Sequence, residues 1–205
     1  MQALDLGAEH RTSLHLPDGE VAHHEAEVVR RVTAMLRLAD VIVSPWRFDG
    51  HPDHDACGRA AAGVRANTGC ALWEAPIWMR HWARLNDVRV PWLRMQSLAV
   101  SNAARASKHA ALAAHVSQLT PRGDGLGAVL DGAIVVRAAR HAEYFFVEAV
   151  PNRTTPGSIN SQRKSMSNMT ASTRSTAEFF STTCFVMTPI SGASNRLGMK
   201  RASAR

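Results

Sequence analysis

The chain has 205 residues, a hydrophobic content of 45% and a formal net charge of +7. This length allows one domain with a substantial core. No apolar run approaches the roughly 20 residues that a membrane-spanning helix needs, so we expect no membrane partner. The first residues do not resemble a secretory signal peptide, and the three cysteines have neither zinc-knuckle nor redox-pair spacing. The expectation is a cytoplasmic protein with reduced thiols.

The positive charge is confined to the C-terminal part of the chain. Residues 151–205 contain eight Lys or Arg and one acidic residue, whereas residues 1–150 contain 16 of each sign. A nucleic-acid or anionic-surface binder with a basic tail is therefore one hypothesis. It ranks last, because residues 1–150 are neutral overall and the tail lacks interleaved aromatic residues. On this interpretation nucleic acid is not an expected partner.

The composition changes abruptly near Val150, which predicts two regions. Residues 1–150 have the hydrophobic patterning of a folded domain. In residues 151–205 about a third of the side chains are Ser or Thr and apolar periodicity is lost. Such a segment buries too little surface to offset its chain entropy, so we expect a disordered tail. Its bias towards Ser, Thr, Arg and Met also suggests a second hypothesis, out-of-frame translation of GC-rich DNA.

Hydrophobic periodicity predicts alternating helices and strands in residues 1–150. The predicted helices cover residues 23–38, 53–66, 101–119 and 130–140, and the predicted strands cover residues 40–44, 71–79, 94–100 and 144–147. The 40–44 strand is short and apolar, as in a strand covered on both faces. Helices alternating with such strands favour an α/β fold with a mainly parallel sheet and flanking helices.

Tryptophans are concentrated in one stretch of the chain. Four of the five, Trp73, Trp78, Trp82 and Trp92, lie in residues 71–93. The simpler interpretation is that these tryptophans pack in the core and border a site. A dedicated platform on which a sugar ring stacks is the alternative.

The segment that follows the 40–44 strand contains the strongest candidates for functional residues. Its sequence, residues 45–54, reads Pro-Trp-Arg-Phe-Asp-Gly-His-Pro-Asp-His. In open α/β sheets, binding sites lie beyond the carboxyl ends of strands. His51 and His54 are three residues apart at the start of a predicted helix, which places both imidazoles on one side. A neutral imidazole is a good zinc ligand, and Asp53 is placed to orient a ring. Helix capping by Asp53 in an ordinary surface loop explains the same residues.

Several motifs, in order, resemble the PIG-L (LmbE-like) family of zinc-dependent N-deacetylases. His51-Pro52-Asp53-His54 is similar to the second signature of that family, and Leu-Pro-Asp-Gly-Glu at residues 16–20 is similar to the segment before it. Further similarities are Pro-Ile-Trp-Met at 76–79, Ser-Gln at 117–118 after a late helix, and Glu-Tyr-Phe-Phe at 143–146. The resemblance extends over about residues 1–150.

The resemblance implies a Rossmann-like domain that binds one zinc ion. It implies a hydrolase that removes acetyl from an N-acetylated amino sugar or a related small molecule. In this family the last histidine of the second signature is a zinc ligand, which assigns that role to His54. The first histidine stabilises the oxyanion or handles a proton, which assigns a catalytic role to His51. Asp53 is then expected to tune and orient His51.

One family motif has no counterpart in the sequence. The first signature of the family, His-Pro-Asp-Asp-Glu, supplies two further zinc ligands and the general base, and no such run occurs here. We therefore expect the C-terminal part of a family domain, incomplete at its N-terminus, with weak zinc binding and impaired activity. The alternative is a non-catalytic remnant or pseudoenzyme that binds a sugar or a partner.

Overall fold

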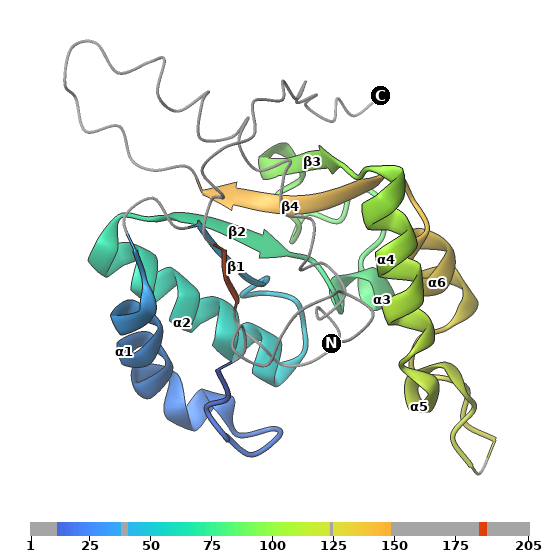
Figure 1. Cartoon of the computed structure of the whole chain (residues 1–205), viewed down its shortest axis with the longest axis horizontal. Helices are drawn as coiled ribbons and strands as arrows, with labels where there is room; N and C mark the ends of the chain where they lie inside the picture. The colour runs from blue at the N-terminus through green and yellow to red at the C-terminus, as the bar shows by residue number, and fades with distance from the viewer. Residues whose placement is uncertain (1–11, 38–40, 124, 149–184, 188–205) are drawn as a thin grey trace. The chain divides into compact units, whose positions relative to one another are not determined.

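A computed structural model of the chain describes residues 12–37, 41–123, 125–148 and 185–187 (Figure 1). The described residues fall into two compact units. The first comprises residues 14–97 with 144–148 and 185–187, and the second consists chiefly of Leu98–Glu143. No helix in these ranges has the length and apolarity to cross a bilayer. The predicted domain boundary at Val150 lies outside the described residues and stays a prediction.

The first unit is an α/β structure that contains most of the sheet. Its helical elements are η3 (Val21–His24), α1 (Glu25–Met35), α2 (Pro52–Thr68), α3 (Met79–Trp82) and η4 (Trp92–Arg94). The strands are β1 (Val41–Pro45), β2 (Ala71–Ala75), β3 (Met95–Ala99), β4 (Ala142–Glu148) and β5 (Phe185–Met187), in the spatial order β3-β4-β2-β1-β5. Each predicted helix and strand has a counterpart, and the α/β class is confirmed. The predicted 71–79 strand is wrong after Ala75, where β2 ends, and α3 begins at Met79.

The prediction of a mainly parallel sheet is wrong, because the sheet is mixed. β1 and β2 are parallel, with Val41 opposite Ala71, and α2 is the crossover between them. β4 pairs antiparallel with β2, and β5 pairs antiparallel with β1. Strand direction is invisible to hydrophobic periodicity, since a strand buried on both faces is apolar throughout in either direction.

The packing of α1 and α2 against β1 and β2 forms the main core of this unit. All five residues of β1 are buried, as predicted for a covered strand. Figure 1 shows α1 beside α2. Their facing side chains join residues of both strands in one cluster, which includes Val28, Val32, Ile42, Val64 and Leu72. This core fixes the carboxyl end of β1 relative to the first turn of α2.

Gly58 allows α2 to lie close to the chain that leaves β1. A Cβ atom at this position would be 2.5 Å from both the Cα and the amide nitrogen of Arg47. Backbone atoms cannot move aside as a flexible side chain can, so only glycine fits here. The close contact places the start of α2 directly beside the segment after β1.

An ion-pair network binds Arg47 to the sheet. Glu74 on β2, with a side chain 1% exposed, accepts bonds from the Arg47 backbone amide at 3.1 Å and from its Nε at 2.7 Å. Glu148 on β4 pairs with Arg47, Arg94 and Arg65 at 2.8–3.1 Å. Burial alone raises the pKa of Glu148, but these three guanidinium groups outweigh burial and hold that pKa below its ordinary value. The hydrogen bond to Glu74 raises the pKa of Arg47.

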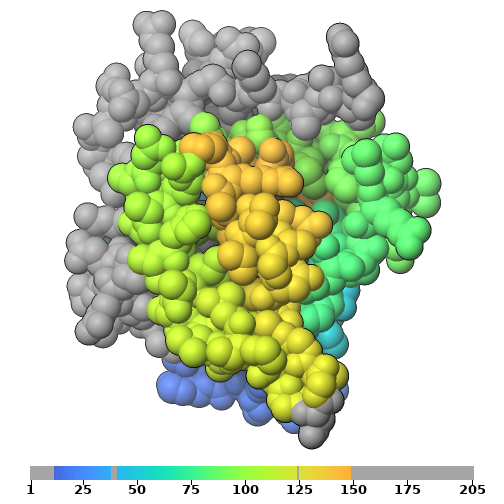
Figure 2. Space-filling view, turned by 90° about the vertical axis from the view of Figure 1, so that its right-hand side faces the viewer, coloured from blue at the N-terminus to red at the C-terminus, as the bar shows by residue number. Residues whose placement is uncertain are grey.

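The second unit is built on three helices, α4 (Asn102–Ala113), α5 (Val116–Leu119) and α6 (Gly132–Ala138), coloured green to yellow in Figure 2. The side chain of Ser101 caps α4 by accepting the amide of Ala104. The predicted long helix is wrong after Ala113, because the chain breaks at Ala114 and His115 before α5. Lys108 on α4 forms a buried ion pair with Glu143.

The tail prediction concerns residues 151–205, which lie outside the described residues except for Phe185–Met187. There the backbone forms β5, with Val186 opposite Ile42 of β1. This short strand belongs to the apolar part of the tail.

We predict that Gly58→Ala destabilises the protein by about 2 kcal/mol or more, because the added methyl overpacks against backbone. Gly63→Ala in the same helix is the matched control. Its Cβ would meet only Val29 Cγ2 at 3.2 Å, and the helix propensity of alanine offsets that contact by about 1 kcal/mol. Urea unfolding of both variants measures the difference. Equal unfolding midpoints would refute the close approach of α2 to Arg47.

Candidate functional site

The candidate site is built on the loop that joins β1 to α2. The loop leaves the sheet at Trp46, whose amide donates to the Ala75 carbonyl of β2 at 2.9 Å. It turns at Gly50, which has a φ of +90°, a conformation that L side chains rarely adopt. The Gly50 amide donates to Asp55 Oδ1 at 3.0 Å, and Pro52 opens α2. The loop is thus held to the sheet at one end and to α2 at the other.

The carboxylate of Asp49 is the most densely bonded acceptor in this loop. Asp49 is fully buried. It accepts the backbone amides of Ile77, Trp78 and Met79 at 2.7–2.9 Å, and it contacts His54 Nδ1 at 2.6 Å. Four donors match the approximately four lone-pair sites of a carboxylate. The Asp49 carbonyl also accepts from Trp82 Nε1 at 2.7 Å. Asp49 therefore joins the site loop to the segment that begins α3.

His54 is held in one tautomer by this arrangement. The three amides around Asp49 are fixed donors, so the carboxylate acts as the acceptor and His54 Nδ1 carries a proton. In a neutral imidazole the other nitrogen, Nε2, then keeps its lone pair. The ring is 6% exposed and lies on the first turn of α2. A carboxylate that orients an imidazole in this way is the usual second-sphere partner of a metal-bound histidine.

His51 lies next to His54, as the three-residue spacing predicts. The ring centroids are 4.6 Å apart, and Trp78 contacts His51 edge-on at 5.6 Å. The Nδ1 atom of His51 is buried and has no hydrogen-bond partner among the described residues. A buried polar atom without a partner is costly, and such atoms are concentrated at functional sites. The two imidazoles therefore form one pair at the start of α2.

Asp53 makes contacts that differ from the predicted ones. Its carboxylate is fully buried and accepts the amides of Gly19 at 2.7 Å and Val21 at 3.2 Å. It therefore holds the segment before η3 against α2, and both of its oxygens are engaged there. The carboxylate that orients an imidazole is Asp49. Asp49 lies in the same segment, residues 45–54, but no sequence pattern there assigns it this role.

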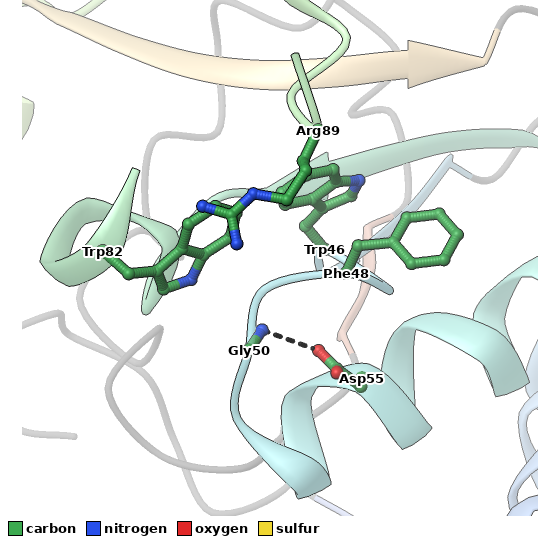
Figure 3. A pocket seen from close by; sticks show the side chains of 6 residues that line it. All are labelled: Trp46, Phe48, Gly50, Asp55, Trp82 and Arg89. Atoms are coloured by element: carbon green, nitrogen blue, oxygen red, sulfur yellow. Dashed lines mark hydrogen bonds between the residues drawn. The ribbon is translucent and has the colours of Figure 1, made fainter. Parts of the chain in front are cut away.

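An open cleft of about 490 Å³ lies beside the loop (Figure 3). It is lined by Trp46, Phe48, Gly50, Asp55, Trp82 and Arg89. Trp46 and Trp82 are stacked at 6.5 Å, and the Arg89 guanidinium carbon lies 4.4 Å from the centre of the Trp82 ring. A Cβ at Gly50 would be 2.7 Å from Trp82 Nε1, so glycine allows the indole to lie against the loop.

The tryptophans predicted to serve either the core or a sugar platform have different environments. Trp73 is 3% exposed and packs on Phe145, so it belongs to the core. Trp78 contacts His51, and Trp82 lines the cleft. Trp92 donates to the carbonyl of Asp87 at 3.0 Å. Trp46, which lies outside the cluster in the sequence, is 2% exposed and also lines the cleft.

The donor set of the loop fits a zinc ion at one position. His54 offers an imidazole that Asp49 orients through Nδ1, and beside it the buried Nδ1 of His51 has no hydrogen-bond partner among the described residues. Within the part of the chain that the structure describes, no group of three or more His, Cys, Asp or Glu side chains is arranged around a common point that could hold a metal. Among the described residues, the loop thus offers one oriented imidazole and no complete set of metal ligands.

One protein-family model matches the N-terminal part of the chain, including this loop. Residues 1–64 match the family model PIG-L, described as GlcNAc-PI de-N-acetylase. These residues carry a PIG-L family domain. The matched range ends within α2 and includes Asp49, His51 and His54. The resemblance of residues 65–150 to PIG-L proteins stays a prediction. No curated protein and no solved structure gives a significant match to the chain.

We predict that Asp49→Asn destabilises the protein by about 3 kcal/mol or more, because a carboxamide cannot accept from four donors and its NH₂ group faces other N–H groups. Asp55→Asn is the control: its Oδ1 accepts a single amide, and asparagine retains that oxygen, so we expect a change of at most about 1 kcal/mol. Urea unfolding measures both. If Asp49→Asn unfolds at the native midpoint, the carboxylate does not organise this loop.

Proposed function

We propose that the chain is related to zinc-dependent hydrolases that remove acetyl from an N-acetylated amino sugar or a related small molecule. The observation that carries this proposal is the Asp49–His54 pair, found in the loop that matches the PIG-L family. A zinc ion, when bound, polarises an amide carbonyl and lowers the pKa of a bound water to about 7. The match to the PIG-L family indicates the class of reaction, and the loop contains the residues that we propose take part in it.

Each residue of the loop has a separate role in this proposal. His54 would hold the metal through Nε2, and Asp49 fixes the orientation of that ring through Nδ1. His51, whose Nδ1 is buried without a hydrogen-bond partner among the described residues, donates to the oxygen that becomes negative when an amide carbonyl is attacked. Asp53 supports the two histidines indirectly. Its carboxylate accepts the backbone amides of Gly19 and Val21 and so holds that segment against the first turn of α2.

A non-catalytic member of the family is the second candidate. Catalytic zinc sites normally have three protein ligands, and His54 with its neighbour His51 offers at most two. On this alternative the loop binds an N-acetylated sugar or a partner without hydrolysing it. Metal content and acetate release separate the two candidates, because a ligand-binding member releases no acetate.

The direct test is the zinc content of the full chain. We expect about one zinc per chain after dialysis against excess zinc, measured by mass spectrometry of the metal, and acetate release from N-acetylglucosamine above the rate without protein. His54→Ala should lose the zinc and lower any acetate release by about a hundredfold or more. His23→Ala, an exposed histidine of η3, is the matched control and should keep both.

The outcomes distinguish the two candidates. Zinc that is lost in His54→Ala without acetate release from any N-acetylated sugar supports the non-catalytic candidate. Zinc content that is equal in His54→Ala and His23→Ala would remove His54 from the metal site, and the hydrolase proposal would fail with it.

A further inference from the structure

β1 is a strand whose two faces are covered, so further pairing takes place only at its edges. Ile42 packs in the core with α1 and α2, and Val41 and Val43, which alternate with it along the strand, are 5% and 2% exposed. β2 pairs with one edge along all five residues. The strand contains no charged residue, and its proline is the last residue, Pro45. It therefore lacks the charges that usually discourage a strand edge from pairing with another chain.

A short strand from the C-terminal region occupies the outer edge of β1 (Figure 1, red). β5 runs antiparallel to β1, with Val186 opposite Ile42 at its centre. Its three residues pair with the three β-branched residues of β1. At the end that β5 does not reach, Pro45 has no N–H and its carbonyl accepts Ser44 Oγ at 3.0 Å. β5 thus covers the part of the edge that most needs backbone partners.

The sequence around β5 has the composition of a strand. Residues 179–188 read Phe-Phe-Ser-Thr-Thr-Cys-Phe-Val-Met-Thr, without a charged residue, a proline or a glycine. They include every aromatic residue of the 151–205 region. Aromatic and β-branched residues are enriched in strands. Local propensity and the observed position of β5 on β1 therefore agree, as they do in a sequence that specifies its structure.

The competing occupant of this edge is β1 of a second copy of the chain. Two copies of β1 are identical apolar strands, and identical edges can pair antiparallel about a two-fold axis. β5 has the advantage of belonging to the same chain, because residues 149–184 connect it to β4. A tethered strand competes at an effective concentration well above that of a second copy in dilute solution. β5 is therefore the favoured occupant.

We propose that the outer edge of β1 is a docking site for an antiparallel apolar strand, and that residues 185–187 of the same chain occupy it. In this position β5 keeps β1 from pairing with a second copy. This role is independent of the proposed function, because it involves no residue of the loop between β1 and α2. It also gives part of the 151–205 region a function in keeping the protein from self-association.

Val186→Pro in the full chain tests this role. Proline removes an N–H from the middle of β5 and is disfavoured inside a paired strand. We expect sedimentation velocity to give this variant an average mass of at least about twice that of the native chain at equal concentration, because two β1 edges then pair. Ala171→Pro, which places a proline outside β5, and Val186→Thr, which keeps a β-branched residue, are the matched controls. Both should sediment like the native chain.

A peptide added to the same variant identifies the edge directly. The peptide has the sequence of residues 182–188 with serine in place of Cys184, lysines at both ends for solubility and a fluorescent label. We expect it to bind Val186→Pro and to return the mass of that variant to the native value. The native chain should bind the peptide at least about tenfold more weakly, because tethered β5 already occupies the edge. The same peptide with proline at position 186 is the control and should bind neither protein.

Two measurements can overturn the proposal. A native mass for Val186→Pro at every concentration would show that β5 does not protect an edge. Equal affinity of the peptide for Val186→Pro and for the native chain would show that β5 does not occupy the docking site. Self-association of the variant that the peptide leaves unchanged would place the contact between copies elsewhere and would overturn the proposal as well.

Discussion

The carboxylate of Asp49 is a charge without solvent contact, and four donors satisfy it: three backbone amides at the start of α3 and one imidazole. A buried anion is tolerated only when its hydrogen bonds are complete. This requirement fixes the distance between the loop after β1 and the segment after β2. It also fixes which nitrogen of His54 is protonated. One residue thus couples the packing of the unit to the chemistry of the imidazole.

The same coupling explains why the cleft and the histidine pair share one loop. The Asp49 carbonyl accepts from the indole of Trp82, which forms one wall of the cleft, while the Asp49 carboxylate orients His54. Gly58 brings α2 close to Arg47, and Arg47 is paired with Glu74 on β2. The loop is therefore supported on both sides by contacts that do not involve the site itself, as precise positioning of functional groups requires.

Local features of this fold were predictable from the sequence, and long-range ones were not. β1 and α2 follow from periodicity, and the facing of His51 and His54 follows from helical spacing. Asp53 was expected to orient His51 because it lies between the two histidines in the sequence, and that role stays a prediction. Residues one or two apart on a helix do not face each other, so its carboxylate points to Gly19 and Val21 instead. Asp49 accepts from backbone amides 28–30 residues away, and no local sequence pattern predicts contacts over that separation.

The break between α4 and α5 occurs in an alanine-rich stretch without glycine or proline, so no residue there signals it.

The protonation of the His54 ring tests the central role of Asp49 most directly. Long-range ¹H–¹⁵N correlation spectra of the metal-free protein at neutral pH report which imidazole nitrogen carries the proton. The arrangement described above predicts a single tautomer, with the proton on Nδ1 and a bare Nε2. A proton on Nε2, or the averaged signal of an imidazole that exchanges freely between both forms, would contradict it.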